Sequence, residues 1–131
     1  MTYTAIVILL ALLEYMVFVM AVGRARGKYE IAAPAVTGNE IFERYYRVQQ
    51  NTVEQIVVFV PAIIAFAYFV GDMWAAGIGL VWIIGRYVYF RGYVAAPEKR
   101  GPGAMLTFIP NLVLVIGALI AAGIAVATAG G

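Results

Sequence analysis

The sequence contains four long apolar stretches, and each is about as long as a helix that crosses a lipid bilayer. Crossing about 30 Å of hydrocarbon takes about 20 helical residues. The apolar stretches run roughly over residues 3–22, 51–70, 74–92 and 104–128. Of the 131 residues, 64% are hydrophobic and only 12% are charged, whereas a soluble domain averages about 25% charged residues. The chain has too little polar surface for a water-soluble fold, so the sequence predicts an integral membrane protein.

The predicted fold class is an all-α membrane protein, a bundle of four transmembrane helices that forms a single domain over residues 1–131. The second helix is expected to begin well before its apolar part, because Asn39 can cap a helix and Ile41-Phe42 begins a helical pattern. This helix would extend past the bilayer into the cytoplasm. Gly71-Asp72 predicts a tight turn, and a longer loop is predicted by Pro97, Gly101, Pro102 and Gly103. The helices are therefore expected roughly at residues 3–22, 40–70, 74–93 and 104–128.

All nine basic residues lie around the first and the third connection between these helices. They are Arg24, Arg26, Lys28, Arg44, Arg47, Arg86, Arg91, Lys99 and Arg100. Four spans place both connections on one side of the membrane, and the positive-inside rule makes that side the cytoplasm. We therefore expect a protein of the bacterial inner membrane with both termini outside and the active site on the cytoplasmic side. Orientation and anionic headgroups explain the basic face, so no nucleic-acid partner is expected.

The chain has no cysteine and no histidine. This excludes thiolate metal sites and a cysteine nucleophile, and it removes the commonest metal ligand and the easiest general base. Any chemistry must therefore use arginine, tyrosine, glutamate or a bound ligand, and no metal is expected.

A stripe of polar residues leads into the second apolar stretch. A helix turns by about 100° per residue, so four polar residues fall within about 80° of one another on one helix face. They are Glu43, Arg47, Asn51 and Glu54. An ion pair between Glu43 and Arg47 would be ordinary at a membrane interface. Asn51 and Glu54 lie a turn or two deeper, where an unpaired carboxylate is costly. We therefore interpret the deeper pair as functional.

Two further sets of polar residues are open to more than one interpretation. Arg86, Tyr89 and Tyr93 share a helix face, and taken alone they indicate an aromatic belt with snorkelling arginines. Glu14 lies about 12 Å inside the cytoplasmic end of the first span, where it must be neutral or paired. Arg86 is a candidate partner at similar depth. The alternative is an ion or proton path that uses Glu14, Glu54 and Arg86.

The stretch from Phe42 to Glu54 reads FERYYRVQQNTVE. It resembles the FERxxRxQxNxxE signature of the MAPEG family, the membrane-associated proteins in eicosanoid and glutathione metabolism. The segment from Tyr89 to Tyr93 reads YFRGY and is similar to the family's YFxGY motif, and Arg100-Gly101-Pro102 is similar to its arginine-x-proline before the last helix. The likeness covers nearly the whole chain in the order and spacing of its motifs and in its four spans.

The resemblance implies a homotrimer with reduced glutathione at each subunit interface. Helices one and two of one subunit would meet helices three and four of its neighbour around the ligand. The residues carried over as glutathione ligands are Arg26, Arg47, Gln49, Asn51, Glu54, Tyr89 and Tyr93, with the two tyrosines coming from the next subunit. Arg100 matches the arginine credited in the family with stabilising the glutathione thiolate. Helical geometry, however, places Gln50 on the polar stripe and Gln49 about 100° away from it.

The function that the resemblance implies is that of a microsomal glutathione transferase-like detoxification enzyme. Glutathione would be the co-substrate, and its thiolate would attack a hydrophobic electrophile or reduce a lipid hydroperoxide that arrives from membrane lipid. The chain departs from the leukotriene-forming members, because Gln55, Arg91 and Gly27 replace their tyrosine, glutamine and arginine, which argues against eicosanoid specificity. The alternative is a non-catalytic trimeric lipid-binding or scaffold protein of the same family. The electrophile, the balance between conjugation and peroxidase activity, and the native thiol stay open at this point.

Overall fold

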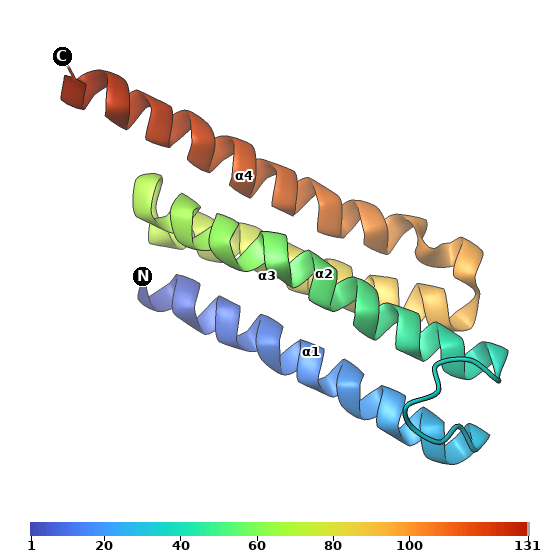
Figure 1. Ribbon diagram of the computed structural model, residues 1–131. Helices are drawn as coiled ribbons and strands as arrows, with labels where there is room; N and C mark the ends of the chain where they lie inside the picture. Colours follow the sequence, from blue (N-terminus) through green and yellow to red (C-terminus); the bar gives the residue numbers. More distant parts are fainter. Residues whose placement is uncertain (131) are drawn as a thin grey trace.

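The computed structural model describes residues 1–130, and every regular element within them is helical. Long helices lie side by side as an elongated bundle (Figure 1). They are α1 (Thr2–Tyr29), α2 (Glu40–Phe69), α3 (Asp72–Ala95) and α4 (Gly101–Gly130), with a short 3-10 helix, η1 (Pro97–Arg100), before α4. Each of the four long helices in this part of the chain is long and apolar enough to cross a membrane. The prediction of four membrane-capable helices is therefore confirmed.

Two boundaries differ from the expected ones. The first helix continues to Tyr29 rather than ending near residue 22, so its last two turns carry Arg24, Arg26 and Lys28. The last helix begins at Gly101, so the expected loop ends earlier and Pro102 lies in the first turn. Proline is tolerated there because a first-turn N–H has no partner within the helix.

The start of α2 follows its sequence. Asn39 is the N-cap, and its Oδ1 accepts a hydrogen bond of 2.9 Å from the backbone N–H of Phe42, as predicted. Arg44, one turn into the helix, forms an ion pair of 3.2 Å with Glu40 and donates to the carbonyl oxygens of Val94 and Ala95 at the end of α3. Those carbonyls have no partner within their own helix. The beginning of α2 is therefore attached to the end of α3.

Asp72 connects α1 to α3 at the opposite end of the bundle. Its carboxylate accepts hydrogen bonds from the backbone N–H groups of Tyr3 and Thr4, at 3.1 and 2.8 Å, and from the Thr4 hydroxyl at 2.6 Å. The first N–H groups of a helix have no intrahelical acceptor. Asp72 thus supplies a cap from a neighbouring helix and sets the relative level of α1 and α3.

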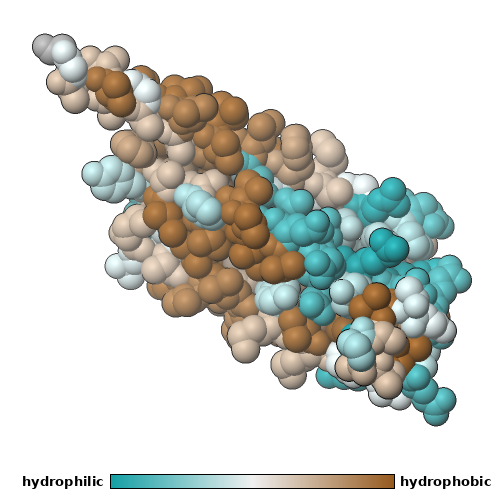
Figure 2. Space-filling model, in the orientation of Figure 1, coloured by the Kyte–Doolittle hydropathy of each residue, from teal (hydrophilic) through white to brown (hydrophobic). Residues whose placement is uncertain are grey.

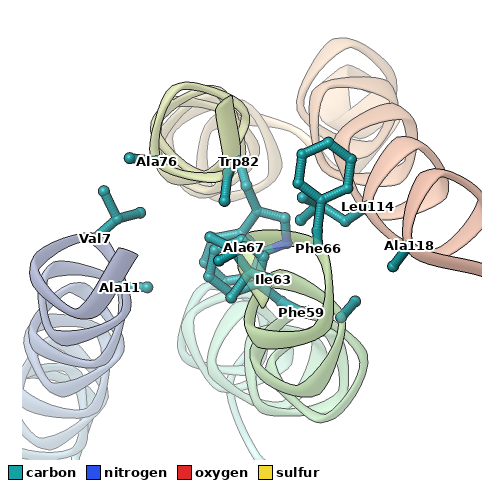
Figure 3. Close-up of a cluster of buried hydrophobic side chains, with 12 residues drawn as sticks. Val7, Ala11, Phe59, Ile63, Phe66, Ala67, Ala76, Trp82, Leu114 and Ala118 are labelled. Carbon is teal, nitrogen blue, oxygen red and sulfur yellow. The ribbon is translucent and has the colours of Figure 1, made fainter. Parts of the chain in front are cut away.

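The apolar core fills the middle of the bundle. Figure 3 shows side chains from the long helices meeting there, with the ring of Phe59 beside Trp82. These two fully buried rings stack with their centroids 4.1 Å apart. Val7 of α1 and Leu114 of α4 close the cluster from either side. The packing orders the helices and leaves large apolar side chains on the outer surface, as expected where lipid is the solvent.

Hydrophilic residues gather at one end of the bundle. Figure 2 shows them covering the end where α1 stops, α2 begins and α3 passes into α4, while the rest of this face is largely hydrophobic. We call this end the polar end. Every candidate ligand-binding residue from the sequence lies in or next to the elements that meet there.

Candidate functional site

A cavity of about 530 Å³ opens at the polar end, between the first half of α2, the end of α3 and η1. Its volume falls within the range of about 300–1,000 Å³ that is usual for small-molecule sites. The lining is polar and aromatic, and its residues are Val36, Thr37, Glu43, Tyr46, Arg47, Gln50, Asn51, Glu54, Tyr89, Tyr93 and Arg100. We call it the polar cavity. It can hold a ligand the size of a short peptide.

Helix α2 presents its polar stripe to this cavity. Arg47, Asn51 and Glu54 follow one another at the spacing of one helix face, so they line the same wall. On the other side of the helix, Val48 and Thr52 are completely buried and hold α2 against its neighbours. Within residues 1–130, neither Arg47 nor Glu54 takes part in an ion pair. Both charges are therefore available to a ligand.

Helix α3 contributes an aromatic wall. Tyr89 and Tyr93 stack with their ring centroids 5.6 Å apart and their planes at 28°. Tyr89 is buried and Tyr93 is half-buried, and both line the polar cavity. One turn of helix separates them, which brings the two phenols to successive levels of the same wall.

Close packing of α3 on α4 brings Arg100 to the polar cavity. A Cβ atom added to Gly103 would overlap the backbone of Tyr89, and one added to Gly85 would lie 2.6 Å from the carbonyl oxygen of Leu106. Only glycine allows the two helices to approach so closely. The tight connection η1 then carries Arg100, whose Nη1 donates 2.9 Å to the carbonyl of Pro97 while the side chain stays exposed at the cavity.

The polar cavity unites most of the residues that the sequence assigned to glutathione binding and thiolate stabilisation. These are Arg47, Asn51, Glu54, Tyr89, Tyr93 and Arg100. All of them come from one chain. In this cavity α3 packs directly beside α2 of its own chain and brings Tyr89 and Tyr93 there; a contribution of tyrosines from the next subunit stays a prediction.

Arg26 and Gln49 lie elsewhere. Arg26 Nη1 donates 2.6 Å to the carbonyl oxygen of Ala35, and its guanidinium carbon lies 5.0 Å from the ring centroid of Phe42. These contacts hold the loop between α1 and α2. Gln49 does not line the polar cavity, whereas Gln50 does. The position of Gln50 agrees with the helical geometry, and the assignment of Gln49 to glutathione stays a prediction.

Three lining residues were not singled out from the sequence. Tyr46 lies three residues after Glu43 and four before Gln50, so the helical period contained the signal. Val36 and Thr37 belong to the loop before α2. No sequence pattern places that loop over the stripe.

Arg86 lies beneath the polar cavity and is only 1% exposed. Its Nη2 donates to the side-chain oxygens of Asn51 and Thr52, and its Nη1 donates to Thr107 of α4. Arg86 was a candidate partner for Glu14, but residues 1–130 show no ion pair between the two, and neutral oxygens accept hydrogen bonds from both terminal nitrogens of Arg86. Glu14 is half-buried, and its Oε1 has no hydrogen-bond partner among residues 1–130.

A second cavity of about 230 Å³ adjoins the first. It shares Asn51, Tyr89 and Arg100 with the polar cavity, and its other lining residues are Gln55, Arg86, Ala104, Thr107 and Phe108. We call it the inner cavity. Arg100 lines both cavities. A group bound beside its guanidinium can therefore be reached from the polar end and from the inside of the helix bundle.

The sequence model of the MAPEG family matches residues 3–120. Human microsomal glutathione S-transferase 2 is 40% identical over 116 residues, which cover 88% of this chain and 79% of the human protein. Bovine leukotriene C4 synthase is 34% identical over 96 residues, covering 73% of this chain and 64% of the relative. An uncharacterized protein from Synechocystis is 46% identical over 118 residues, covering 90% and 86%.

Proposed function

The chain belongs to the MAPEG family, and from this premise we propose that it is a membrane-bound glutathione transferase that activates the glutathione thiol. One observation carries the proposal: Arg47, Asn51 and Glu54 of α2 line one cavity with the tyrosine pair of α3 and with Arg100. Related proteins whose names describe glutathione transferases match most of the chain. The activity would serve detoxification.

The charges of the polar cavity complement those of glutathione. The tripeptide carries two carboxylates, one ammonium group and a thiol. Arg47 can bind a carboxylate in two parallel hydrogen bonds, since its guanidinium is planar and unpaired within residues 1–130. Glu54 offers the carboxylate that the ammonium group needs. Asn51 supplies amide donors for a peptide carbonyl or a second carboxylate.

Arg100 is proposed to stabilise the thiolate. A free thiol has a pKa of about 8.5, and only the thiolate is nucleophilic. Lowering that value by about two pKa units requires about 2.7 kcal/mol, which one guanidinium in a partly dry site can supply. Arginine remains protonated, so it acts by electrostatic stabilisation while water accepts the proton. The thiolate then forms a C–S bond with the electrophile as the leaving group departs.

The second substrate is proposed to be apolar and to arrive from the bilayer. The inner cavity supports this, because Ala104 and Phe108 line it together with Arg100. A hydrophobic electrophile or a lipid hydroperoxide placed there would lie next to a sulfur bound at the guanidinium. Both reactions begin with the same thiolate. With a hydroperoxide it breaks the O–O bond and releases an alcohol, and a second glutathione then reduces the resulting sulfenic acid to glutathione disulfide and water.

A homotrimer would reconcile the family motif with the polar cavity. The family resemblance assigns Arg26 and Gln49 to glutathione, yet neither lines this chain's own cavity. In a trimer they can serve the cavity of a neighbouring subunit. The polar end would face the cytoplasm of a bacterial cell, since the basic residues are concentrated there.

The test uses detergent-purified protein. Calorimetry measures the binding of reduced glutathione, and ultraviolet absorbance measures the thiolate in the complex. A conjugation assay with a hydrophobic aryl halide then compares the parent protein with Arg100→Ala. The proposal expects binding, thiolate absorbance and conjugation in the parent, with conjugation lost in the variant.

The alternative is a non-catalytic lipid-binding protein of the same family. An apolar groove of about 480 Å³ between α2 and α4, lined by Val57, Pro61 and Leu119 among others, favours it. If the parent and Arg100→Ala are equally inert towards every electrophile tested while a fatty acid binds, the lipid-binding function replaces the enzymatic one.

A further inference from the structure

The buried guanidinium of Arg86 joins three helices directly beneath the polar cavity. Nη2 lies 2.7 Å from Asn51 Oδ1 and 2.8 Å from Thr52 Oγ1, both on α2. Nη1 lies 3.2 Å from Thr107 Oγ1 on α4. Burying a charge costs free energy. We therefore ask what a buried arginine directly under a ligand cavity contributes to ligand binding.

The direction of these hydrogen bonds is not ambiguous. Arginine has donors and no acceptor, so Asn51 must turn its carbonyl oxygen towards Arg86 whichever way the amide is assigned. The Thr52 and Thr107 hydroxyls already donate to the backbone oxygens of Val48 and Gly103, at 2.7 and 2.9 Å. Each oxygen near the guanidinium therefore accepts from it. The NH₂ group of Asn51 is left to point away from Arg86.

The same guanidinium supports the aromatic wall. Its carbon lies 4.4 Å from the ring centroid of Tyr89, which is within the range of a cation–π contact. Tyr89 in turn stacks on Tyr93. One buried cation thus holds a residue of the α2 wall and a residue of the α3 wall in fixed relation to each other.

We propose that Arg86 is a positioning residue that fixes Asn51 as a hydrogen-bond donor to glutathione and holds Tyr89 beside it. This inference rests on the proposed function and adds a specific pairing to it. The ligand group that meets Asn51 is an acceptor, a peptide carbonyl or a carboxylate, and not the ammonium group. Arg86 itself does not line the polar cavity, where glutathione is proposed to bind.

Substitution of Arg86 tests the role. Arg86→Met removes the hydrogen-bond donors. Arg86→Lys keeps the charge but loses the planar guanidinium group, whose several N–H donors reach several acceptors. The matched control is Arg91→Met, since Arg91 lies on the same helix, is exposed, does not line the polar cavity, and forms a hydrogen bond and a cation–π contact with its neighbour Tyr87. Calorimetry should show glutathione binding weakened about tenfold in Arg86→Met and less in Arg86→Lys. Arg91→Met should bind within about twofold of the parent.

Two readouts separate positioning from a merely structural effect. In the double variant Arg86→Met/Asn51→Ala, the loss of binding should be clearly smaller than the sum of the two single losses, because the part of the Arg86 effect that passes through Asn51 is counted once and only the part that passes through Tyr89 is added. In Arg86→Met the KM for glutathione should rise, while the pKa of the bound thiol should stay near that of the parent. Additive losses in the double variant would contradict the proposal.

A second variant keeps the test valid if Arg86→Met does not fold. Asn51→Asp gives Arg86 a better partner and preserves the buried contact, but it presents no donor to the ligand. Gln50→Glu adds the same charge to the same cavity wall and measures the cost of that charge alone. Asn51→Asp should bind glutathione about tenfold more weakly than Gln50→Glu. Equal binding by the two would overturn the proposal.

Failure of the inference can be told from failure of the proposed function. If the parent binds no glutathione, both the proposed function and the inference about Arg86 are wrong. If the parent binds glutathione while Arg86→Met and Asn51→Asp match their controls, only the inference is wrong.

Discussion

Arg47 of α2 and Arg100 of η1 line the same cavity at the polar end of the bundle. They belong to different helices and come together because α3 packs against both α2 and the start of α4. Within residues 1–130 neither guanidinium is paired with a carboxylate. Two free cations therefore face one ligand-sized space, and the account of function depends on this arrangement.

Arg47→Ala should weaken glutathione binding by about 10- to 100-fold, because the ligand carboxylate loses a charge-assisted pair. Calorimetry on detergent-purified protein measures the change. The control is Arg24→Ala, which removes an exposed arginine of α1 that does not line the polar cavity. Equal weakening by both substitutions would show that Arg47 acts through overall charge and not through contact.

Glu54→Gln should lower the affinity for glutathione, because the ammonium group loses its carboxylate partner. A glutathione analogue without the ammonium group provides the matched ligand. The parent and Glu54→Gln should bind that analogue with about equal affinity. A loss of the same size for both ligands would exclude an ammonium contact at Glu54.

Gly103→Ala should lower the melting temperature and reduce conjugation, because the new methyl group overlaps the backbone of Tyr89 and forces α4 away. Overpacking of this kind costs about 1–3 kcal/mol. Gly123→Ala, also in α4, has nothing within 4 Å of the added atom, so it should be neutral or slightly stabilising. A melting temperature for Gly103→Ala equal to that of Gly123→Ala would disprove the close approach of α3 and α4.

Glu14→Gln should leave glutathione binding within about twofold of the parent. Glu14 does not line the polar cavity, and its buried Oε1 has no hydrogen-bond partner among residues 1–130. Proteoliposomes of the parent should conduct protons no faster than empty liposomes. A proton flux that disappears in Glu14→Gln would favour the proton-path interpretation.

Much of the fold follows from the sequence. The lengths of the apolar stretches predict the long helices, and Asn39 marks the start of α2 through its capping geometry. The start of α4 was placed too late because Gly101 and Pro102 indicate a loop to any local pattern. In the structure the same residues form the first turn of the helix, where proline is compatible with helical geometry.

The sequence predicts which residues share each helix face of the candidate site, but it does not predict that these faces meet around one cavity. Helical periodicity places Arg47, Asn51 and Glu54 on one face, and it places Tyr89 above Tyr93. It does not show that these faces meet within one chain, which depends on the packing of α3 against α2 and α4.

The partners of Arg86 were missed for a different reason. Matching of opposite charges favoured Glu14, whereas neutral oxygens of Asn51, Thr52 and Thr107 satisfy the guanidinium. A search for charge pairs does not detect such acceptors.

The central claim is that the cations of the polar cavity hold glutathione with its sulfur deprotonated. A titration of thiolate absorbance against pH, on the protein–glutathione complex, tests it most directly. The account predicts a thiol pKa about two units below the free value of about 8.5 in the parent, and a return towards the free value in Arg100→Ala. An unshifted thiol pKa in the parent complex would contradict it.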